Sequence, residues 1–246
     1  MSQSLSTMKP SRFAAPPMKP EVFFGRQAVL DRRRHTVGYS LMYRHGDLEE
    51  RFFRQPLESA DTAVEMMMLE WGFERVIGHQ YGFVDISTQF LRPELLAGIP
   101  SDRGVAVLHD AQLSDDSLAA MRAAAAAGAR FALTDLYDLD PKNVARSADL
   151  FSFVGIDTTR ISMIWLPDLV ARAREMFPAA QLIAGNVDDL DGFRATAEMG
   201  FDLFHGGFFT ELEIVDRRDR AAGATAALDL IAVSTTPLRR STTSPA

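Results

Sequence analysis

Acidic, amide and histidine side chains recur directly after short apolar runs along the chain, and their types suit the chemistry of a pocket. They are Asp85, His109 with Asp110, Thr134 with Asp135, Asp157, Asn186 with Asp188, and His205. Carboxylates and imidazoles can bind cations and move protons, so a ring of them at one end of a sheet is typical of a ligand-binding or hydrolytic site. Polar residues at strand ends also begin loops and cap helices, so each position has a structural alternative.

The aspartates divide into two groups on this basis. Asp110 precedes an expected helix by a few residues, and Asp188 with Asp189 stands where another expected helix needs an N-cap. Capping explains these three more simply than chemistry does. Asp85 and Asp135 each directly follow an apolar run that is expected to form a strand. A carboxylate so placed points toward the mouth of a barrel, so we expect these two to face a pocket.

These residues are too few for a two-metal hydrolytic centre. Holding two cations about 3.5–4 Å apart requires several carboxylates, some of them bridging, and Asp85, Asp135 and Asp188 do not supply enough. His109 and His205 could add ligands to a single-metal site, but their spacing matches no metal signature, and a histidine is more often satisfied within the fold or exposed. No Gly-rich phosphate loop or Gly-x-Ser-x-Gly motif is present. We therefore expect neither a metal nor another cofactor.

A further candidate comes from the stretch Val37–Arg44, with the sequence VGYSLMYR, which predicts a strand. Alternate residues of a strand share a face, so Ser40, Met42 and Arg44 are expected on one side of the sheet. Arg44 offers a fixed fork of hydrogen-bond donors, which suits an anion. The expected ligand-binding residues are therefore Arg44, Asp85, Asp135, Asp188 and His205.

The elements that must position these residues alternate between short strands and helices. Strands are expected at Glu21–Leu30, Val37–Arg44, Tyr81–Ile86, Gly104–Leu108, Arg130–Leu133, Leu150–Ile156, Gln181–Ala184 and Asp202–Phe204. Helices are expected at Ser59–Ile77, Gln89–Ala97 and Ser114–Ala127, from Pro141, and at Met163–Met176, Leu190–Met199 and Ala221–Ile231. This alternation indicates parallel βα units, whereas the short DRRRH turn makes the first two strands antiparallel. The prediction is an α/β fold, a modified TIM-type (βα)8 barrel with an antiparallel first strand.

Composition limits the classes of function. The chain has 246 residues, 47% of them hydrophobic, which is enough for a large core. A net charge of −7 argues against a general nucleic-acid binder. The absence of cysteine excludes disulfides, thiolate catalysis and cysteine-ligated zinc. No apolar run approaches the roughly 20 residues of a membrane span or forms a signal peptide, so we expect a cytoplasmic protein that binds neither membrane nor nucleic acid.

The chain is expected to form one domain between two tails. Residues 1–20 are rich in Pro, Ser and Lys without periodicity, and residues 234–246 have the same character, which predicts flexible tails. No linker and no repeat of fixed period divides the part between them. Residues 21–233 are therefore expected to form a single barrel domain.

Several segments, taken in order, resemble the EAL domain, the barrel family that hydrolyses the bacterial second messenger cyclic di-GMP. They are FFGRQAVLD (Phe23–Asp31), GYSLMYR (Gly38–Arg44), FVDIS (Phe83–Ser87), GARFALTD (Gly128–Asp135), GID (Gly155–Asp157), LIAGNVDD (Leu182–Asp189) and MGFDLFHGGFF (Met199–Phe209). The similarity runs unbroken from about Val22 to Val215 and is strongest to the branch in which an HDOD domain follows the EAL module. Its specificity comes from the shared register, because each segment alone is a weak signal.

The resemblance implies that most of the family's metal-binding and catalytic positions have been replaced. The glutamate that names the EAL motif falls on Ser40, the glutamate of the fourth strand on Ala106, and the first of the paired aspartates on Thr134. The catalytic lysine falls on Gly155, and the first of two late glutamates on Gly185. The loop after the paired aspartates, LYDLD, also departs from the family's glycine-bearing stretch, which helps to pair subunits and to order the metal site.

Other positions keep a polar group. The motif arginine is retained as Arg44, and the second of the paired aspartates as Asp135. The family's metal-binding asparagine falls on Asp85, its second late glutamate on Asp188, and its closing glutamine on His205. A barrel packs without the lost groups, whereas a metal pair does not hold without them.

The resemblance therefore implies a degenerate EAL domain, a pseudoenzyme that acts in bacterial signal transduction as a protein-interaction or regulatory module. Two alternatives remain open: a sensor that binds cyclic di-GMP without hydrolysing it, and a residual phosphodiesterase that uses Asp85, Asp135, Asp188 and His205. The sequence names neither the protein partner nor the oligomeric state, and a homodimer is a further open alternative. The loss of polar groups disfavours the sensor, because each buried unpaired group of the ligand costs about 1–3 kcal/mol.

Overall fold

The computed structural model describes residues 22–45, 72–109, 112–136, 141–208 and 213–215. The two expected tails lie outside these residues, as do the expected helix Ala221–Ile231 and most of the expected helix Ser59–Ile77. The domain boundaries at 21 and 233 therefore stay predictions.

A long antiparallel hairpin begins the barrel. Strand β1 (Val22–Asp31) pairs with strand β2 (Thr36–His45). The turn between them is tight because the Asp31 carboxylate accepts hydrogen bonds from the backbone N–H groups of Arg33 and His35, both at 2.8 Å, and Arg34 adopts a left-handed φ of 65°. The antiparallel first strand is confirmed.

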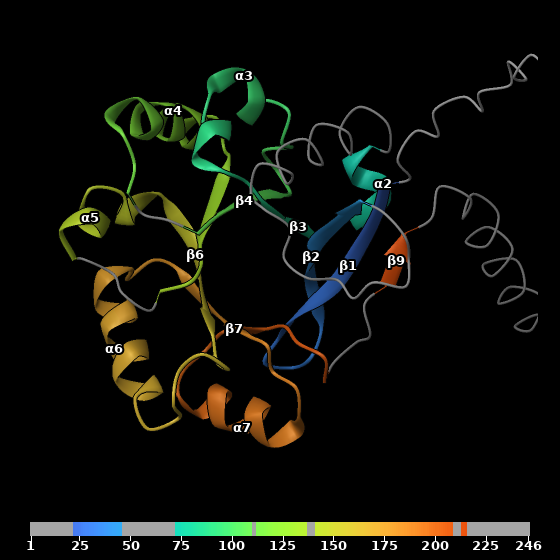
Figure 1. The fold of residues 1–246 in the computed structure, drawn as a ribbon, viewed down its shortest axis with the longest axis vertical. Coiled ribbons are helices and arrows are strands. Elements are labelled where there is room, and N and C mark those ends of the chain that lie inside the picture. Colours follow the sequence, from blue (N-terminus) through green and yellow to red (C-terminus); the bar gives the residue numbers. More distant parts are fainter. Residues whose placement is uncertain (1–21, 46–71, 110–111, 137–140, 209–212, 216–246) are drawn as a thin grey trace, which may run out of the picture.

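The remaining strands complete a ring of which the hairpin forms one side (Figure 1). They are β3 (Tyr81–Asp85), β4 (Gly104–Leu108), β5 (Arg130–Leu133), β6 (Phe151–Asp157), β7 (Gln181–Gly185) and β8 (Leu203–Phe204). Successive strands from β2 to β8 are parallel, and β1 is antiparallel to both β2 and β8. The prediction of a modified TIM-type barrel is thus confirmed.

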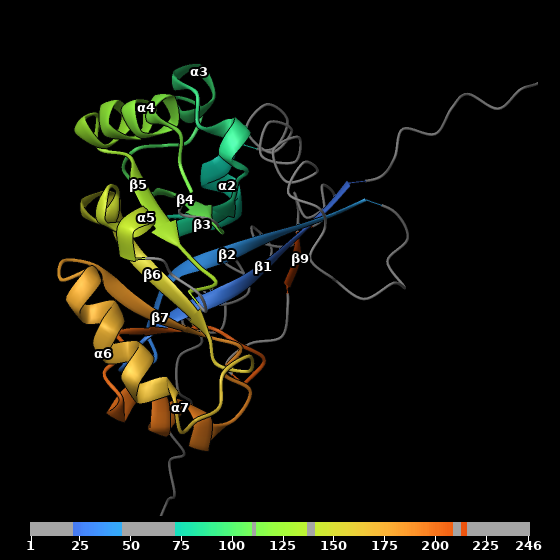
Figure 2. The same cartoon turned by 60° about the vertical axis from the view of Figure 1, so that its left-hand side comes forward.

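One strand was not expected from the sequence. Strand β9 (Glu213–Val215) pairs antiparallel with β1 at Phe24–Arg26. Figure 2 shows that this end of the β1–β2 hairpin extends away from the ring, with β9 alongside. Three residues carry too little periodicity to predict a strand, so only the pairing reveals this one.

Helices surround the outside of the ring (Figures 1 and 2). They are α2 (Phe73–Ile77), α3 (Pro93–Leu96), α4 (Asp115–Ala126), α5 (Pro141–Ala145), α6 (Leu166–Met176) and α7 (Leu190–Glu198), with 3-10 turns at Thr88–Phe90 and Ala148–Leu150. Within the described ranges no helix combines the length and apolar character that a membrane span requires.

Two of the expected helices are corrected. The expected helix Gln89–Ala97 is split into a 3-10 turn and the short helix α3, because Pro93 forces the preceding Arg92 into an extended conformation. The helix expected from Met163 begins only at Leu166, with Pro at the start of α6 and the residues before it in a turn.

Two hydrophobic clusters pack on the two faces of the barrel wall. The interior cluster is built from Val29, Phe83, Val105, Val107, Ala132, Phe153, Ile183 and Leu203. The outer cluster fills the space between strands and helices. The clusters alternate along a strand: on β4, Val105 and Val107 lie inside, whereas Ala106 and Leu108 lie in the outer cluster. This alternation fixes which side chains can reach the mouth of the barrel.

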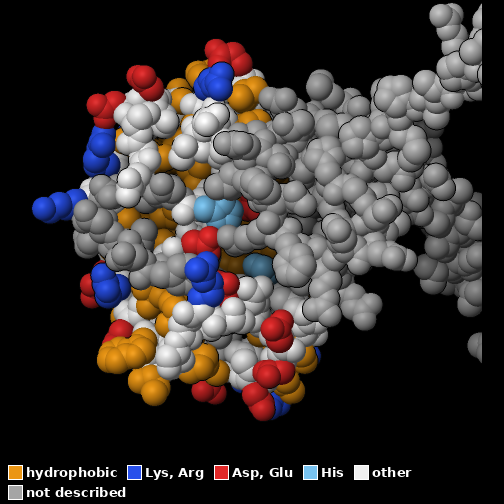
Figure 3. Space-filling model, in the orientation of Figure 1, with side chains coloured by type: hydrophobic (Ala, Val, Ile, Leu, Met, Phe, Trp, Pro, Cys, Tyr) orange, Lys and Arg blue, Asp and Glu red, His pale blue; other side chains and the backbone are white. Residues whose placement is uncertain are grey.

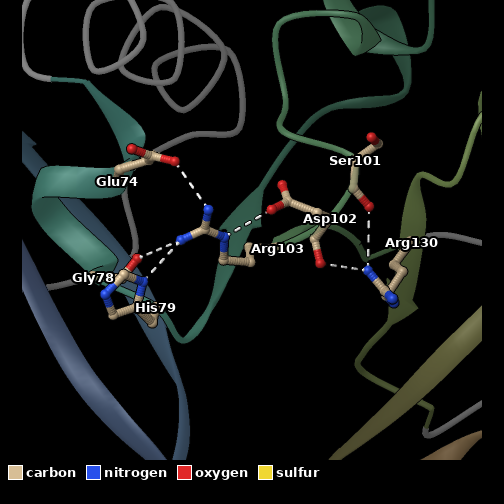
Figure 4. Close-up of polar contacts among 7 residues, drawn as sticks. All are labelled: Glu74, Gly78, His79, Ser101, Asp102, Arg103 and Arg130. Atoms are coloured by element: carbon tan, nitrogen blue, oxygen red, sulfur yellow. Dashed lines mark hydrogen bonds and ion pairs between the residues drawn. The ribbon is translucent and has the colours of Figure 1, made fainter.

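Arginines secure the edge where the parallel strands begin (Figure 4). Arg103 donates to the Glu74 carboxylate at 2.9 Å, to the Asp102 carboxylate at 2.8 Å and to the Gly78 carbonyl at 3.0 Å. Arg130 donates to the Asp102 carbonyl at 2.8 Å. These contacts join α2 to the segments preceding β4 and β5. In barrels of this type such an edge serves stability, and function belongs to the opposite end.

A single arginine, Arg174, fastens α6 to the segments that precede β7 and β8. Arg174 donates to the Ala180 carbonyl at 3.1 Å and, through Nη2, to the Gly200 carbonyl and the Asp202 carboxylate, both at 2.6 Å. The same Asp202 oxygen accepts from the Leu182 backbone N–H at 2.9 Å. The ion pair is therefore tied to β7 through Leu182 and to the segments that precede β7 and β8.

Candidate functional site

The inward face of each strand continues past the last apolar residue into a polar mouth. His109 is the next inward position after Val105 and Val107 on β4. The same alternation brings Asp85, Thr134, Gly155, Asp157, Gly185 and His205 to the mouth. Ser40 pairs in parallel register with the inward-facing Phe83 and shares its side of the sheet. In the view of Figure 3, histidine side chains lie beside acidic ones near the centre of the ring.

The centre of this mouth is a bridge from Asp85 through His109 to Asp135. The His109 ring nitrogens lie 3.0 Å from an Asp85 oxygen (Nε2) and 3.0 Å from an Asp135 oxygen (Nδ1). The His109 and Asp135 side chains are only 12% and 17% exposed, whereas Asp85 is 42% exposed. The bridge crosses the carboxyl ends of β3, β4 and β5, so it connects three neighbouring strands at their working edge.

Thr134 also contacts the bridge. Its hydroxyl oxygen lies 2.8 Å from His109 Nδ1 and donates weakly to the Leu108 carbonyl at 3.4 Å. Asp135, the next residue, has a φ of 62°, a left-handed conformation that is uncommon outside glycine. Backbone strain of this kind persists only where surrounding contacts hold it, and here the contact to His109 is one of them.

The opposite side of the mouth is filled by His205. Its Nδ1 lies 3.3 Å from the Gln27 side-chain oxygen on β1. A Cβ at Gly185 would lie 3.3 Å from His205 Nε2, and a Cβ at Gly155 would lie only 2.8 Å from the Thr134 methyl group. The space that longer side chains at 155 and 185 would need is therefore already occupied.

Asp157 adds an ionised carboxylate to the rim. Burial opposes ionisation, but hydrogen bonds from Thr159 and Asn186 outweigh it, so the pKa of Asp157 lies below its usual value. The Thr159 hydroxyl donates at 2.7 Å and its backbone N–H at 3.0 Å. Asn186 has a left-handed φ of 57°, as Asp135 does on the other side.

The late aspartates have separate structural roles. Asp189 caps α7 by accepting from the Gly192 N–H at 2.6 Å, as expected for an N-cap. Asp188 does not cap; it accepts from the Gly207 N–H at 3.2 Å and is exposed. It joins the end of β7 to the segment after β8 rather than entering the central bridge.

The expected site residues are thus only partly brought together. Asp85 and Asp135 meet through His109, and His205 lies on the same mouth against Gly185. Arg44 lies in β2, but its side chain is outside the part that the structure describes, as is Asp110. Whether these residues bind a ligand therefore stays a prediction.

His109 was expected among the polar residues at the strand ends but not in the ligand-binding set, and one family position was misplaced. The alternation Val105, Val107, His109 is the signal that places His109 inward. Conversely, the family's glutamate was assigned to Ala106, which packs in the outer cluster and cannot face the mouth. The assignment ignored the two-residue period of a strand.

The described residues do not fit a divalent ion. Among them no three His, Asp or Glu side chains are grouped so that they could hold a metal. Asp85 and Asp135, the carboxylates nearest the centre, have the His109 ring between them. The arrangement instead forms a hydrogen-bond network that joins three strands at the barrel mouth.

Known proteins resemble this chain at low identity. "Cyclic di-GMP phosphodiesterase CdgJ" of Vibrio cholerae is 26% identical over 201 residues, covering 80% of this chain. An EAL domain protein of Listeria monocytogenes matches with a TM-score of 0.58 at 12% identity, covering 78% of this chain and 88% of its own. The YkuI protein of Bacillus subtilis, with an EAL domain and in complex with cyclic di-GMP and calcium, matches with a TM-score of 0.59 at 14% identity, covering 87% and 62%.

These matches establish the fold. No family model matches the chain. The chain spans about half the length of the curated relatives it matches: 49% of the uncharacterized protein YuxH of Bacillus subtilis and 45% of CdgJ. What those longer proteins do as a whole is therefore a separate question from what this barrel does.

Proposed function

We infer that this chain, which has the EAL-domain fold, is a catalytically inactive module of bacterial signal transduction that acts by binding a partner protein. The observation that carries the proposal is the insertion of the His109 ring between Asp85 and Asp135. Phosphodiester hydrolysis by two cations requires carboxylates that converge on them. Here the central carboxylates converge on an imidazole.

The replaced positions support the same conclusion. Gly155 and Gly185 face the mouth where a lysine and a glutamate stand in the EAL pattern, and Thr134 and His205 fill the space beside them. A group that stabilises a metal or a transition state must reach the reacting atoms. Neither glycine can supply one.

An exposed apolar turn favours protein binding over nucleotide sensing. Met163, Ile164 and Trp165, just before α6, are 45%, 79% and 66% exposed. In the orientation of Figure 1, hydrophobic side chains lie at the surface on the side of the molecule where α6 stands (Figure 3). Large exposed apolar side chains that are contiguous mark interaction sites, whereas isolated ones need no explanation. Trp in particular often anchors a partner.

The second candidate is a sensor that binds cyclic di-GMP without hydrolysing it. It is favoured by YkuI, a protein with the same fold that binds this nucleotide. Arg44 would then bind a phosphate, so Arg44→Ala would weaken nucleotide binding. A residual phosphodiesterase that uses Asp85, Asp135, Asp188 and His205 is the third candidate, and the name of CdgJ favours it.

A nucleotide assay separates the three. The purified chain is incubated with cyclic di-GMP and Mg²⁺ or Mn²⁺, with CdgJ as the active comparison, and the linear dinucleotide is quantified by chromatography; calorimetry measures binding in parallel. We expect neither product nor binding at micromolar concentrations. Formation of the linear dinucleotide would refute the proposal outright. Micromolar binding without product would instead support the sensor that binds cyclic di-GMP.

The docking part is tested with surface variants. Ile164→Asp and Trp165→Asp are compared with Glu94→Ala, which changes an exposed residue of α3 on another side of the ring. We expect the wild type and Glu94→Ala to cross-link the same proteins in the source cell. Both turn variants should lose these proteins. Equal recovery by all four forms would remove this turn from the interface.

A further inference from the structure

We propose that the His109 imidazole takes the bridging position of a divalent ion between Asp85 and Asp135, so that the barrel mouth is held together without a metal. The proposal concerns how the mouth is built and does not depend on which partner or nucleotide the barrel binds. Its starting point is the placement of two carboxylates on either side of one ring.

The spacing of the bridge excludes a shared small cation. Mg²⁺ holds its oxygen ligands at about 2.0–2.1 Å, so two oxygens on one ion lie within about 4.2 Å of each other. Asp85 and Asp135 each lie 3.0 Å from a different nitrogen of the His109 ring. A ring with a hydrogen bond on either side holds the two oxygens farther apart than one ion does.

The contacts of the ring show how it spans the mouth. Asp85 and Asp135 each face a different nitrogen of His109, at 3.0 Å. The Thr134 hydroxyl adds a third contact, because it lies 2.8 Å from Nδ1 and 3.4 Å from the Leu108 carbonyl. Both polar atoms of the ring therefore have protein partners on the neighbouring strands.

The same contacts count against a nucleophilic triad. Thr134, His109 and Asp85 are spaced as a nucleophile, a base and an orienting acid would be, at 2.8 and 3.0 Å. The base would have to accept the Thr134 proton at Nδ1, but an Asp135 oxygen also lies 3.0 Å from that atom. The nitrogen that a base needs free therefore already has a second partner.

The surroundings are packed for this arrangement. The Thr134 methyl group would lie 2.8 Å from a Cβ at position 155, and the His205 ring 3.3 Å from a Cβ at position 185, so both occupy the space that side chains there would take. A longer side chain at either position therefore requires Thr134 or His205 to move. The mouth is a repacked unit rather than a metal site with ligands missing.

The test compares manganese binding and stability in three forms. Wild type, His109→Ala and the control His35→Ala are titrated with Mn²⁺ by calorimetry and unfolded thermally with and without Mn²⁺, in the absence of nucleotide. His35 is 72% exposed in the hairpin turn, away from the mouth. We expect no Mn²⁺ response from wild type or His35→Ala. His109→Ala should melt about 5 °C or more lower and regain part of this loss with Mn²⁺, because the two carboxylates become accessible to it.

Two results would overturn the proposal. The first is micromolar Mn²⁺ binding by the wild type, because the ion and the ring cannot share the position. The second is a His109→Ala variant as stable as the wild type, because the bridge would then hold nothing. If His109→Ala does not fold, the Mn²⁺ titration of the wild type still tests the proposal. The variant His109→Gln can donate to only one side of the bridge through a single amide, so its stability should lie between those of wild type and His109→Ala. Hydrolysis of cyclic di-GMP would refute the proposed function. It would refute this inference as well only if the hydrolysis required a metal ion bound at the bridge.

Discussion

Gly155 and Thr134 test directly whether the mouth is packed as one unit. A Cβ at position 155 would lie 2.8 Å from the Thr134 methyl carbon but 3.5 Å from its Cβ, which is ordinary contact. Gly155→Ala should therefore be destabilising in the wild type, because overpacking costs about 1–3 kcal/mol. Thr134→Ser removes the methyl group and keeps the hydroxyl that contacts His109.

The magnitude follows from opposing terms. In a strand, alanine is favoured over glycine by about 0.5–1 kcal/mol, so Gly155→Ala in the wild type should cost about 1–2 kcal/mol net. In the Thr134→Ser background the clash is absent, and the same change should be neutral or slightly stabilising. The coupling energy between the two sites is then about 2 kcal/mol, within the range for residues in contact.

The assay is urea unfolding of the four proteins of the cycle, followed by circular dichroism. Gly82→Ala is the matched control, since its Cβ would lie 2.6 Å from Phe73 on the outer face of the barrel, where Thr134→Ser gives no relief. The cost of Gly82→Ala should be the same in both backgrounds. Additive effects of Gly155→Ala and Thr134→Ser, within about 0.5 kcal/mol, would refute the claim that these two positions are packed together.

Two further predictions follow from the polar contacts. Arg174→Ala should cost about 2–3 kcal/mol in urea unfolding, because it removes an ion pair and two carbonyl contacts at a partly buried site. Arg122→Ala, which removes an ion pair to Asp149 and a contact to the Arg146 carbonyl at a more exposed site, should cost clearly less, and equal costs would contradict this reasoning. The lowered pKa of Asp157 means that its ionised form is stabilised by folding, so its contribution is present above the unfolded value of 3.8 and is lost as the pH falls through the lower folded value. The stability difference between wild type and Asp157→Asn, measured by unfolding at pH 7, 5 and 3, should shrink only at the lowest pH, and a difference independent of pH would count against the assigned contacts.

The fold was predictable because its signals are local. Apolar runs of β-branched and aromatic residues, such as Gly104–Leu108, mark strands, and the short turn after Asp31 requires an antiparallel pair. The helix split at Pro93 was also readable from the conformation that proline imposes on the residue before it. Strand β9 was not predictable, because three residues become a strand only through pairing with β1.

The site was less predictable because it depends on neighbours across strands. Asp85 and Asp135 were expected at the mouth, but nothing local shows that a third strand places His109 between them. The inward period of β4 excludes Ala106 and selects His109, and this is the part of the site that strand alternation alone could have supplied. The contact of Thr134 with Gly155 requires the register of β5 against β6.

The pairing of β1 with both β2 and β8 has a consequence for biosynthesis. One neighbour of this strand, β2, follows at once, but the other, β8, lies near the far end of the barrel sequence, as the hydrogen bond from Arg32 to the Phe201 carbonyl, 169 residues apart, illustrates. A chain emerging from the ribosome therefore carries a hairpin with one unprotected edge until nearly the whole barrel has been made. Such edges invite aggregation, and pairings this distant form slowly. Truncation just before β8 should accordingly yield insoluble chains rather than a smaller folded barrel.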